Sequence, residues 1–337
     1  MNITVEDAPG KTFTLTVQDS KGTVFQALRE VTFVKSTGSA LSEFAFIRDP
    51  NPPVNSGNDF EIRQNNQGGI TITKYTGSRG YVNIPETIEG IKVTEIGVGA
   101  FSKESDVPLF VQDGDYSETV PRISSIEQDV YTVFIPNTVT KIGGRAFKGQ
   151  LLREVRIGNS VKTIGSEAFD GCKLTSLTIP NSVTEIGVGA FANNAINSLS
   201  LGNGLVAIRG ETFQNNALTE LSLPATLRTI SYRAFQGNRI TTLTIPRGVT
   251  KLGSNAFAGS NFFSTIRSTT ITTVSIPSSL TDFADAFGRN DITTITIGAN
   301  VDTRNLTQFG NDFRAFYEGQ GKKAGTYAWS GRIWAVK

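Results

Sequence analysis

The sequence has no histidine and a single cysteine, and these two scarcities exclude whole classes of chemistry. Without histidine there is no Ser-His-Asp or Cys-His machinery, no histidine metal ligand, and no general base of the commonest kind. A single thiol, Cys172, forms neither an internal disulfide nor a thiolate zinc site. Glycoside hydrolysis needs only two carboxylates, but no two acids stand out from the rest of the sequence. We therefore expect a protein that is not an enzyme and that uses neither a cofactor nor a metal.

Charge and long apolar runs are also scarce. Only 18% of the 337 residues are charged, and the net charge is +2, which is too small to indicate nucleic acid or an anionic membrane as a partner. No apolar run is long enough to predict a membrane-spanning segment. The first residues, 1–6, lack the apolar core of a secretion signal, so two readings stay open: the protein is cytoplasmic, or a leader has been removed.

Phenylalanine recurs with a period of 22 residues, and this repeat decides the architecture. Six positions follow the period strictly: Phe147, Phe169, Phe191, Phe213, Phe235 and Phe257. Phe101, Phe287 and Phe309 continue the column across insertions, which gives nine units. A unit of this size cannot bury its own apolar face and must stack on copies of itself. The sequence therefore predicts a solenoid.

Each unit begins with a strand pattern. In residues 174–179, Leu177 and Ile179 alternate with Ser176 and Thr178, which is the period-two signature of a half-buried strand. Proline then ends the strand in most units. The fold class that we predict is an α/β repeat solenoid, mostly β, with one short strand per 22-residue unit.

The return leg of the unit has a different spacing. Val183, Ile186, Ala190 and Phe191 are spaced by three, four and one residues, which predicts a loose helical or 3₁₀ turn with all four side chains in the core. A glycine that follows the isoleucine in several units predicts a backbone position with positive φ. These glycines are Gly97, Gly143, Gly165, Gly187 and Gly253.

A polar column follows the phenylalanine column by three residues. Its members are Gln150, Cys172, Asn194, Asn216, Asn238, Ser260, Asn290 and Asp312. Such side chains are able to bond the loop backbone of the neighbouring turn, which stacking removes from water. We expect a structural role for the column, including a packed, unreactive thiol at Cys172.

The repeated phrase, L-x-x-L-x-I-P-x-x-V-x-x-I-G-x-x-A-F with Asn or Cys three residues later, resembles the BspA-like class of bacterial leucine-rich repeats. The resemblance extends over residues 69–313. It implies an arc of repeats outside a bacterial cell, with the leader removed. It also implies an adhesin that binds host matrix and plasma proteins, although function transfers less safely than fold.

Three regions are predicted along the chain. Residues 1–58 form an N-terminal module or cap, with a strand over residues 12–17 and a short helix around residues 24–31. Residues 59–313 form the repeat array, with insertions at 102–129 and 261–270. Residues 314–337 form a C-terminal cap or tail.

Two surfaces are candidates for binding. The outward side of the strands is rich in hydroxyls and poor in charge, and the insertion at 261–270 carries two phenylalanines. The candidate ligand-binding residues are Phe134, Glu154, Arg156, Ser176, Thr178, Ser198, Ser200, Glu220, Ser222, Thr242, Thr244, Phe262 and Phe263. Structural explanations stay open for both surfaces, because threonine suits strands and the two phenylalanines are equally suited to tuck beneath a turn. The acidic insertion at 102–129 has two open readings as well, a calcium site or a solvated loop.

The function that we expect is therefore non-enzymatic. The first hypothesis is an adhesin at the bacterial cell surface, or secreted, that binds host extracellular proteins through the repeat surface. The alternatives are a self-assembling structural envelope protein and a glycan-binding protein.

Overall fold

The computed structural model describes residues 15–18, 24–27, 53–103, 126–259, 271–283, 285–309 and 312–337. The chain divides into two compact units, Met1–Pro53 and Val54–Lys337. In the first unit, β1 (Leu15–Gln18) pairs antiparallel with β2 (Val24–Ala27). The helix predicted around residues 24–31 is therefore wrong over residues 24–27. The reason is that Val24 and Phe25 suit a strand, and the neighbouring β1 offers them a partner for backbone pairing.

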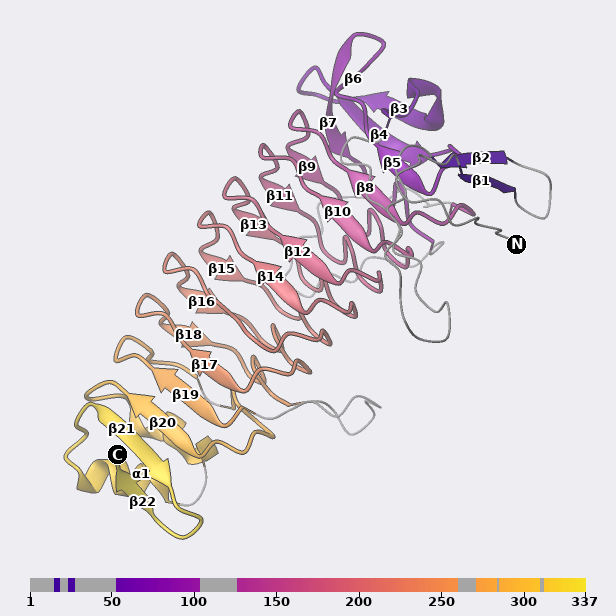
Figure 1. The fold of residues 1–337 in the computed structure, drawn as a ribbon. Helices are drawn as coiled ribbons and strands as arrows, with labels where there is room; N and C mark the ends of the chain where they lie inside the picture. Colours follow the sequence, from indigo (N-terminus) through magenta and orange to yellow (C-terminus); the bar gives the residue numbers. More distant parts are fainter. Residues whose placement is uncertain are drawn as a thin grey trace, which may run out of the picture. The chain divides into compact units, whose positions relative to one another are not determined.

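The second unit is the predicted solenoid, in which successive turns stack along one axis (Figure 1). Each turn contributes a short strand to a row that we call the front row. The front row consists of β5 (Tyr81–Asn83), β8 (Thr132–Phe134), β10 (Glu154–Arg156), β12 (Ser176–Thr178), β14 (Ser198–Ser200), β17 (Thr242–Thr244), β19 (Thr273–Ile276) and β20 (Thr294–Ile297). Pairing within this row is parallel and in register, as between Ser176 and Ser198. The fold class is confirmed.

The return leg differs from the prediction, because it carries a second row of short parallel strands. This second row consists of β4 (Ile70–Tyr75), β7 (Ile91–Ile96), β9 (Lys141–Ile142), β11 (Thr163–Ile164), β13 (Glu185–Ile186), β15 (Ala207–Ile208), β16 (Thr229–Ile230) and β18 (Lys251–Leu252). Most of these strands have two residues, and a turn follows each two-residue strand. Stacking brings equivalent residues of neighbouring turns side by side, so two residues in extended conformation are enough to form a ladder. The spacing of apolar residues within one unit contains no information about this pairing between units.

The phenylalanine column forms the centre of the core. From Phe101 to Phe287 the rings stack in sequence, with centroids 4.7 to 5.9 Å apart. Val183, Ile186 and Ala190 point into the same core, as their spacing predicted. One continuous core therefore runs through all the turns, which is the reason that the units need one another.

Glycine recurs at one position of the repeat for a different reason from the one predicted. None of the five glycines in that column has positive φ. A Cβ added to Gly187 would lie 2.3 Å from the backbone nitrogen of Ser166 on the preceding turn. Glycine is needed there because two backbones approach closely. Positive φ occurs two residues later instead, at Gly189 and at its equivalents Arg145, Glu167, Glu211, Arg233, Asn255 and Asp285.

The polar column has the predicted structural role wherever its side chains are described with partners. The amide of Asn216 donates to the carbonyl of Phe191 on the preceding turn at 2.9 Å. Its side-chain oxygen accepts from the backbone N–H of Ile196 at 3.0 Å. Asn194, Asn238 and Asn290 make the same pair of bonds. Each amide therefore joins two turns and satisfies groups that have no contact with water.

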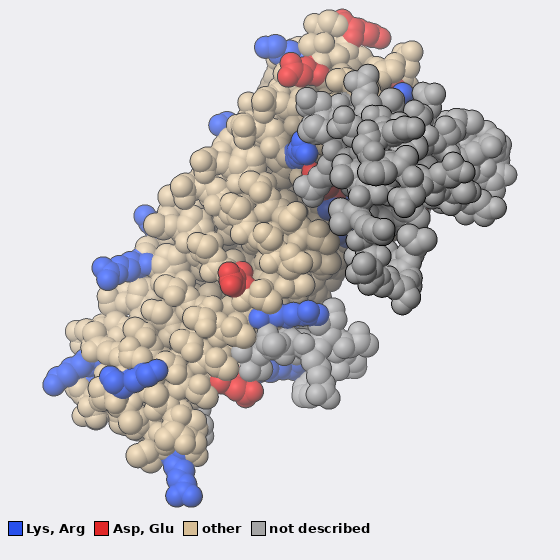
Figure 2. Space-filling view, in the orientation of Figure 1, with Lys and Arg blue, Asp and Glu red and all other residues tan. Residues whose placement is uncertain are grey.

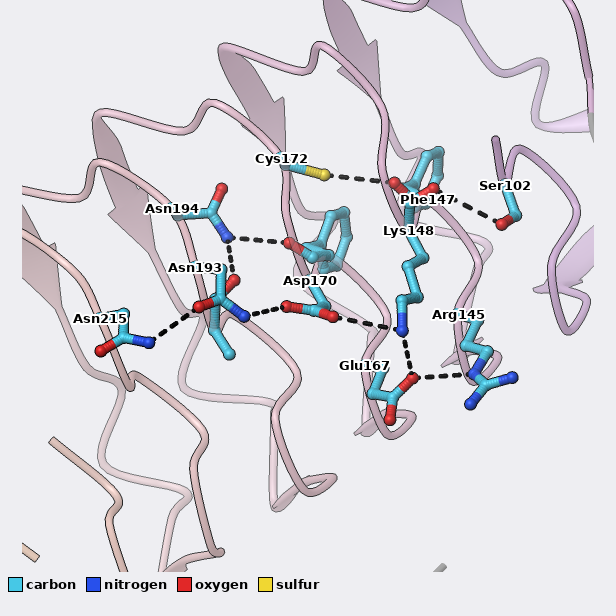
Figure 3. A network of polar contacts seen from close by, with 12 residues as sticks. Ser102, Arg145, Phe147, Lys148, Glu167, Asp170, Cys172, Asn193, Asn194 and Asn215 are labelled. Carbon is cyan, nitrogen blue, oxygen red and sulfur yellow. Dashed lines mark hydrogen bonds and ion pairs between the residues drawn. The ribbon is translucent and has the colours of Figure 1, made fainter. Parts of the chain in front are cut away.

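Cys172 fits into this column as a packed thiol. Its sulfur donates to the carbonyl of Phe147 at 3.2 Å (Figure 3). Burial raises the pKa of the thiol to about 12. The thiol is therefore neutral at ordinary pH and unreactive as a nucleophile.

Segments outside the repeat cover both ends of the stack. At the N-terminal end, β3 (Phe60–Gln64) pairs antiparallel with β4, and β6 (Thr87–Ile88) pairs with β7. The edge of β5 is covered by Asn55, whose backbone N–H donates to the carbonyl of Asn83 at 2.9 Å. The side-chain oxygen of Asn55 accepts from the N–H of Asn83 at 2.8 Å. A short 3₁₀ helix, η1 (Gly57–Asp59), precedes β3.

At the C-terminal end, a 3₁₀ helix, an α-helix and a hairpin follow the last turn (Figure 1). They are η2 (Thr303–Phe309), α1 (Phe313–Gly319), β21 (Gly325–Trp329) and β22 (Trp334–Val336). β21 pairs antiparallel with β20, which ends the parallel ladder. Phe313 and Trp334 close the core, with ring centroids 4.7 Å apart.

Candidate functional site

The outward side chains of the front row form the surface that we call the strand face. It includes the equivalent residues 220–222, which lie in the same row without forming a strand. The prediction of a strand at this place in every unit is therefore wrong for that unit, whose strand is β16 in the second row. Leu199, Leu221 and Leu223 are only partly buried there, so the inward residues pack less completely at this point of the stack.

The predicted alternation of the strand face is confirmed. Leu177, Val155 and Leu243 are buried, whereas their neighbours Ser176 and Thr178 are exposed. Exposed positions on the strand face are Arg156, Ser176, Thr178, Ser198, Ser200, Glu220, Ser222, Thr242 and Thr244. Phe134 and Glu154, also among the predicted binding residues, are partly buried. Figure 2, in the orientation of Figure 1, shows a surface with few charged side chains over the middle turns.

The exposed hydroxyls of the strand face from β12 to β17 have no internal hydrogen-bond partner, whereas that of Thr296 on β20 lies 2.9 Å from the hydroxyl of Thr326 on β21. Across the part of the chain that the structure describes, no hydrogen bond involves the side chains of Ser176, Thr178, Ser198, Ser200, Ser222, Thr242 and Thr244. The threonines directly before β13 and β9 behave differently, because the hydroxyl of Thr184 donates to the carbonyl of Lys162 at 3.4 Å and that of Thr140 to the carbonyl of Thr94 at 3.2 Å. The strand face thus keeps its donors and acceptors available to another molecule.

One end of the strand face is aromatic and charged. The guanidinium carbon of Arg156 lies 4.5 Å from the ring centroid of Phe134, a cation–π contact. The Nε of Arg156 is 3.3 Å from a carboxylate oxygen of Glu154. The structure therefore brings these three predicted residues together on neighbouring strands β8 and β10.

Tyr81 belongs to the same end and was missed in the sequence. It lies opposite Thr132 in the register of β5 and β8, and 49% of its surface is exposed. Burial of the rest of the side chain raises the pKa of its hydroxyl. Its position in the sequence could have identified it, because Tyr81 occupies the place in its unit that Thr132 occupies in the next unit.

The two insertions lie almost wholly outside the described residues. Phe262, Phe263 and five acidic residues of the insertion at 102–129 lie there, namely Glu104, Asp106, Asp113, Asp115 and Glu118. At the described end of that insertion, Asp129 lies 2.8 Å from Lys103.

Some of the acidic residues that the structure describes pair with basic ones across neighbouring turns. Lys148 lies 2.8 Å from Glu167 and 3.3 Å from Asp170, and Arg145 lies 2.8 Å from Glu167 (Figure 3). Burial alone would raise the pKa of Glu167, but the two cations outweigh it and hold the pKa below its usual value. The network continues through Asn193, whose amide donates to Asp170 at 2.8 Å. It holds turns together and does not form an acid/base pair facing a cleft.

No cluster of three or more potential metal ligands occurs among the described residues. Within the same residues, no helix has the length and apolar character needed to cross a bilayer.

Comparison with known protein families finds the BspA type leucine rich repeat region, in six copies, over residues 140–264 and 196–313. Together these matches cover more than half of the chain. The chain belongs to the BspA-type leucine-rich repeat family. The resemblance read from the repeated phrase is thereby confirmed. Comparison with curated proteins finds no significant match.

Solved structures similar to this BspA-type chain are bacterial. A leucine rich cell surface protein from Faecalibacterium prausnitzii is 19% identical, over 76% of this chain and 80% of that one, with a TM-score of 0.38. The pneumococcal vaccine antigen PcpA is 18% identical, over 73% and 71%, with a TM-score of 0.45. A leucine-rich repeat protein from Bacteroides ovatus is 20% identical, over 76% and 71%, with a TM-score of 0.37.

Proposed function

We propose that this protein is a non-catalytic adhesin, displayed on the bacterial cell surface or secreted, that binds host extracellular proteins through its strand face. The observation that supports this most is the set of exposed hydroxyls without internal partners. A hydroxyl that serves only the stack is expected to bond the neighbouring backbone, as those of Thr140 and Thr184 do. A solenoid also offers a continuous surface along which a partner is able to contact several turns at once.

The aromatic end of the strand face supplies the anchor in this proposal. Tyrosine, phenylalanine and arginine are residue types that contribute strongly to protein interfaces, and Tyr81, Phe134 and Arg156 lie on adjacent strands. The cation–π contact holds Arg156 and Phe134 in place before binding, so less side-chain entropy is lost on association. Residues 1–53 act as a separate module, residues 54–58 belong with the solenoid, where Asn55 bonds β5, and residues 314–337 act as a C-terminal cap.

End-to-end self-assembly has weaker support. It requires open strand ladders at the ends of the stack, whereas Asn55 covers the edge of β5 and the antiparallel β21 ends the front row.

Solid-phase binding to immobilised fibronectin, fibrinogen and laminin tests the proposal. We expect saturable binding to at least one of them by the wild-type chain, and a loss of at least tenfold in the combined variant Thr178→Arg, Ser200→Arg, Ser222→Arg. The control is Thr184→Arg. Thr184 is an exposed threonine directly before the second-row strand β13, in the same turn as Thr178, and this variant is expected to bind like wild type. Equal binding by the folded triple variant would show that the strand face is the wrong surface.

A further inference from the structure

The middle and C-terminal turns of the strand face carry a regular lattice of hydroxyls. From β12 to β20 two outward columns run along the stack, Ser176, Ser198, Glu220, Thr242, Thr273 and Thr294 in one and Thr178, Ser200, Ser222, Thr244, Ser275 and Thr296 in the other. Glu220 is the single charged residue among these twelve positions. The register aligns equivalent residues within two runs of paired strands, as Ser176 with Ser198 and Thr242 with Thr273, while residues 220–222 between the two runs form no strand.

The dimensions of this lattice follow from strand geometry. Parallel strands lie about 4.8 Å apart, and outward residues two apart on one strand are separated by about 6.6 Å. A folded globular partner has no matching period, so it contacts such a lattice at scattered points. A partner that repeats every 4.8 Å contacts every turn in the same way.

A cross-β fibril has that repeat. Its strands stack about 4.7–4.8 Å apart, and in-register stacking sets identical side chains in ladders along its sides. The nearly uncharged lattice fits ladders of uncharged polar side chains, because charged ladders would find no counter-charges on it. We propose that the strand face binds laterally to cross-β fibrils whose exposed ladders are uncharged and polar.

This inference rests on the proposed function in one respect, that the strand face is the binding surface. Docking is lateral because a fibril end adds strands only to an open ladder, and both ends of the front row are covered. From β12 to β20 the lattice has six segments, so its length is about 24 Å and its contact area is roughly 300 Å² per partner. That is below the usual size of a specific interface, so we expect weak binding by one molecule.

Co-sedimentation tests the inference with fibrils assembled from a synthetic uncharged peptide rich in Asn and Gln. We expect saturable co-sedimentation that depends little on salt and that an excess of the same peptide in monomeric form does not displace. The double variant Ser200→Arg, Thr244→Arg is expected to bind at least tenfold more weakly. The control variant Thr184→Arg, Thr250→Arg places the same two substitutions on the second row and is expected to bind like wild type. Circular dichroism checks that each variant is folded. If the strand-face double variant is not folded, Thr244→Asp is used in its place.

Three results would overturn the inference. Equal binding by the folded strand-face variant would place the contact elsewhere. Equal binding to cellulose particles would show that recognition does not depend on the cross-β repeat. Absence of fibril binding, while the wild-type chain still captures a soluble matrix protein through the strand face, would reject the fibril partner and leave the proposed adhesin standing. Failure of both assays would reject both proposals.

Discussion

Two glycines of the same turn, Gly187 and Gly189, allow the packing of the solenoid to be tested against its backbone conformation. An added Cβ at Gly187 would lie 2.3 Å from the backbone nitrogen of Ser166 and 2.6 Å from the carbonyl carbon of Gly165. At Gly189, where φ is +64°, the nearest atom to an added Cβ is the Cγ of Glu167 at 3.6 Å. The first substitution therefore meets a steric clash with the preceding turn, and the second meets only the cost of a left-handed residue.

The magnitudes follow from these distances. Relief of a 2.3 Å contact requires the two turns to separate by about 1 Å, which strains the packing by about 1–3 kcal/mol. It also weakens the bond from the N–H of Gly187 to the carbonyl of Ile164, now 2.8 Å, at a further cost of about 1–3 kcal/mol. Gly187→Ala should therefore lower the free energy of unfolding by about 2–6 kcal/mol. Gly189→Ala should lower it by about 1–2 kcal/mol.

Guanidinium denaturation followed by circular dichroism measures both changes under the same conditions. Because a solenoid is held together by contacts between neighbouring turns, Gly187→Ala should also reduce the cooperativity of the transition, visible as a smaller m-value. A destabilisation by Gly189→Ala equal to or larger than that by Gly187→Ala would refute the close-approach explanation of the glycine column.

Three further substitutions test the core, the polar column and the ion-pair network. Phe191→Ala removes a ring from the middle of the stack and should lower the free energy of unfolding by about 3–5 kcal/mol in a denaturant titration. Asn197→Ala, at an exposed position, should lower it by less than about 0.5 kcal/mol. Equal losses would mean that the inside and outside are misassigned. Asn216→Ala leaves the buried N–H of Ile196 without a partner and removes one of the two amides that donate to the carbonyl of Phe191. It should cost about 1–3 kcal/mol, and a neutral result would reject the structural role of the column. The pKa of Glu167 is lower in the folded chain than its ordinary value of 4.5, so its stabilising effect is present above that pH and is lost as the pH falls through the folded pKa. Glu167→Gln should therefore lower the thermal midpoint at pH 7 and lessen its decline below pH 4.5, and an unchanged pH profile would contradict the pairing with Lys148.

The features that sequence reasoning predicted correctly depend on the repeat. The column of phenylalanines, the alternation of Ser176 with Leu177 and the bonds of Asn216 each follow from one unit placed on another identical unit. Because every turn repeats the same pattern, a preference that is weak in one unit is present in all of them, and the local pattern predicts the fold of the whole stack.

The features that were missed depend on contacts between turns or between strands. The two-residue strand at Glu185–Ile186 exists because the neighbouring turn supplies its partner. The glycine column is explained by a distance between two backbones, which one unit does not contain. Tyr81 was missed because the first front-row strand departs from the repeated phrase, although its register with Thr132 places it on the strand face.

Site-specific photo-crosslinking is the measurement that tests the central claim most directly. Cys172 is the only cysteine and is fully buried, so a thiol introduced by Ser200→Cys on the strand face is labelled selectively by a benzophenone maleimide. Thr184→Cys supplies the same probe on the second row. With a matrix protein that the wild-type chain captures, we predict strong crosslinking from position 200 and little from position 184. Crosslinking from position 184 alone would contradict the assignment of binding to the strand face.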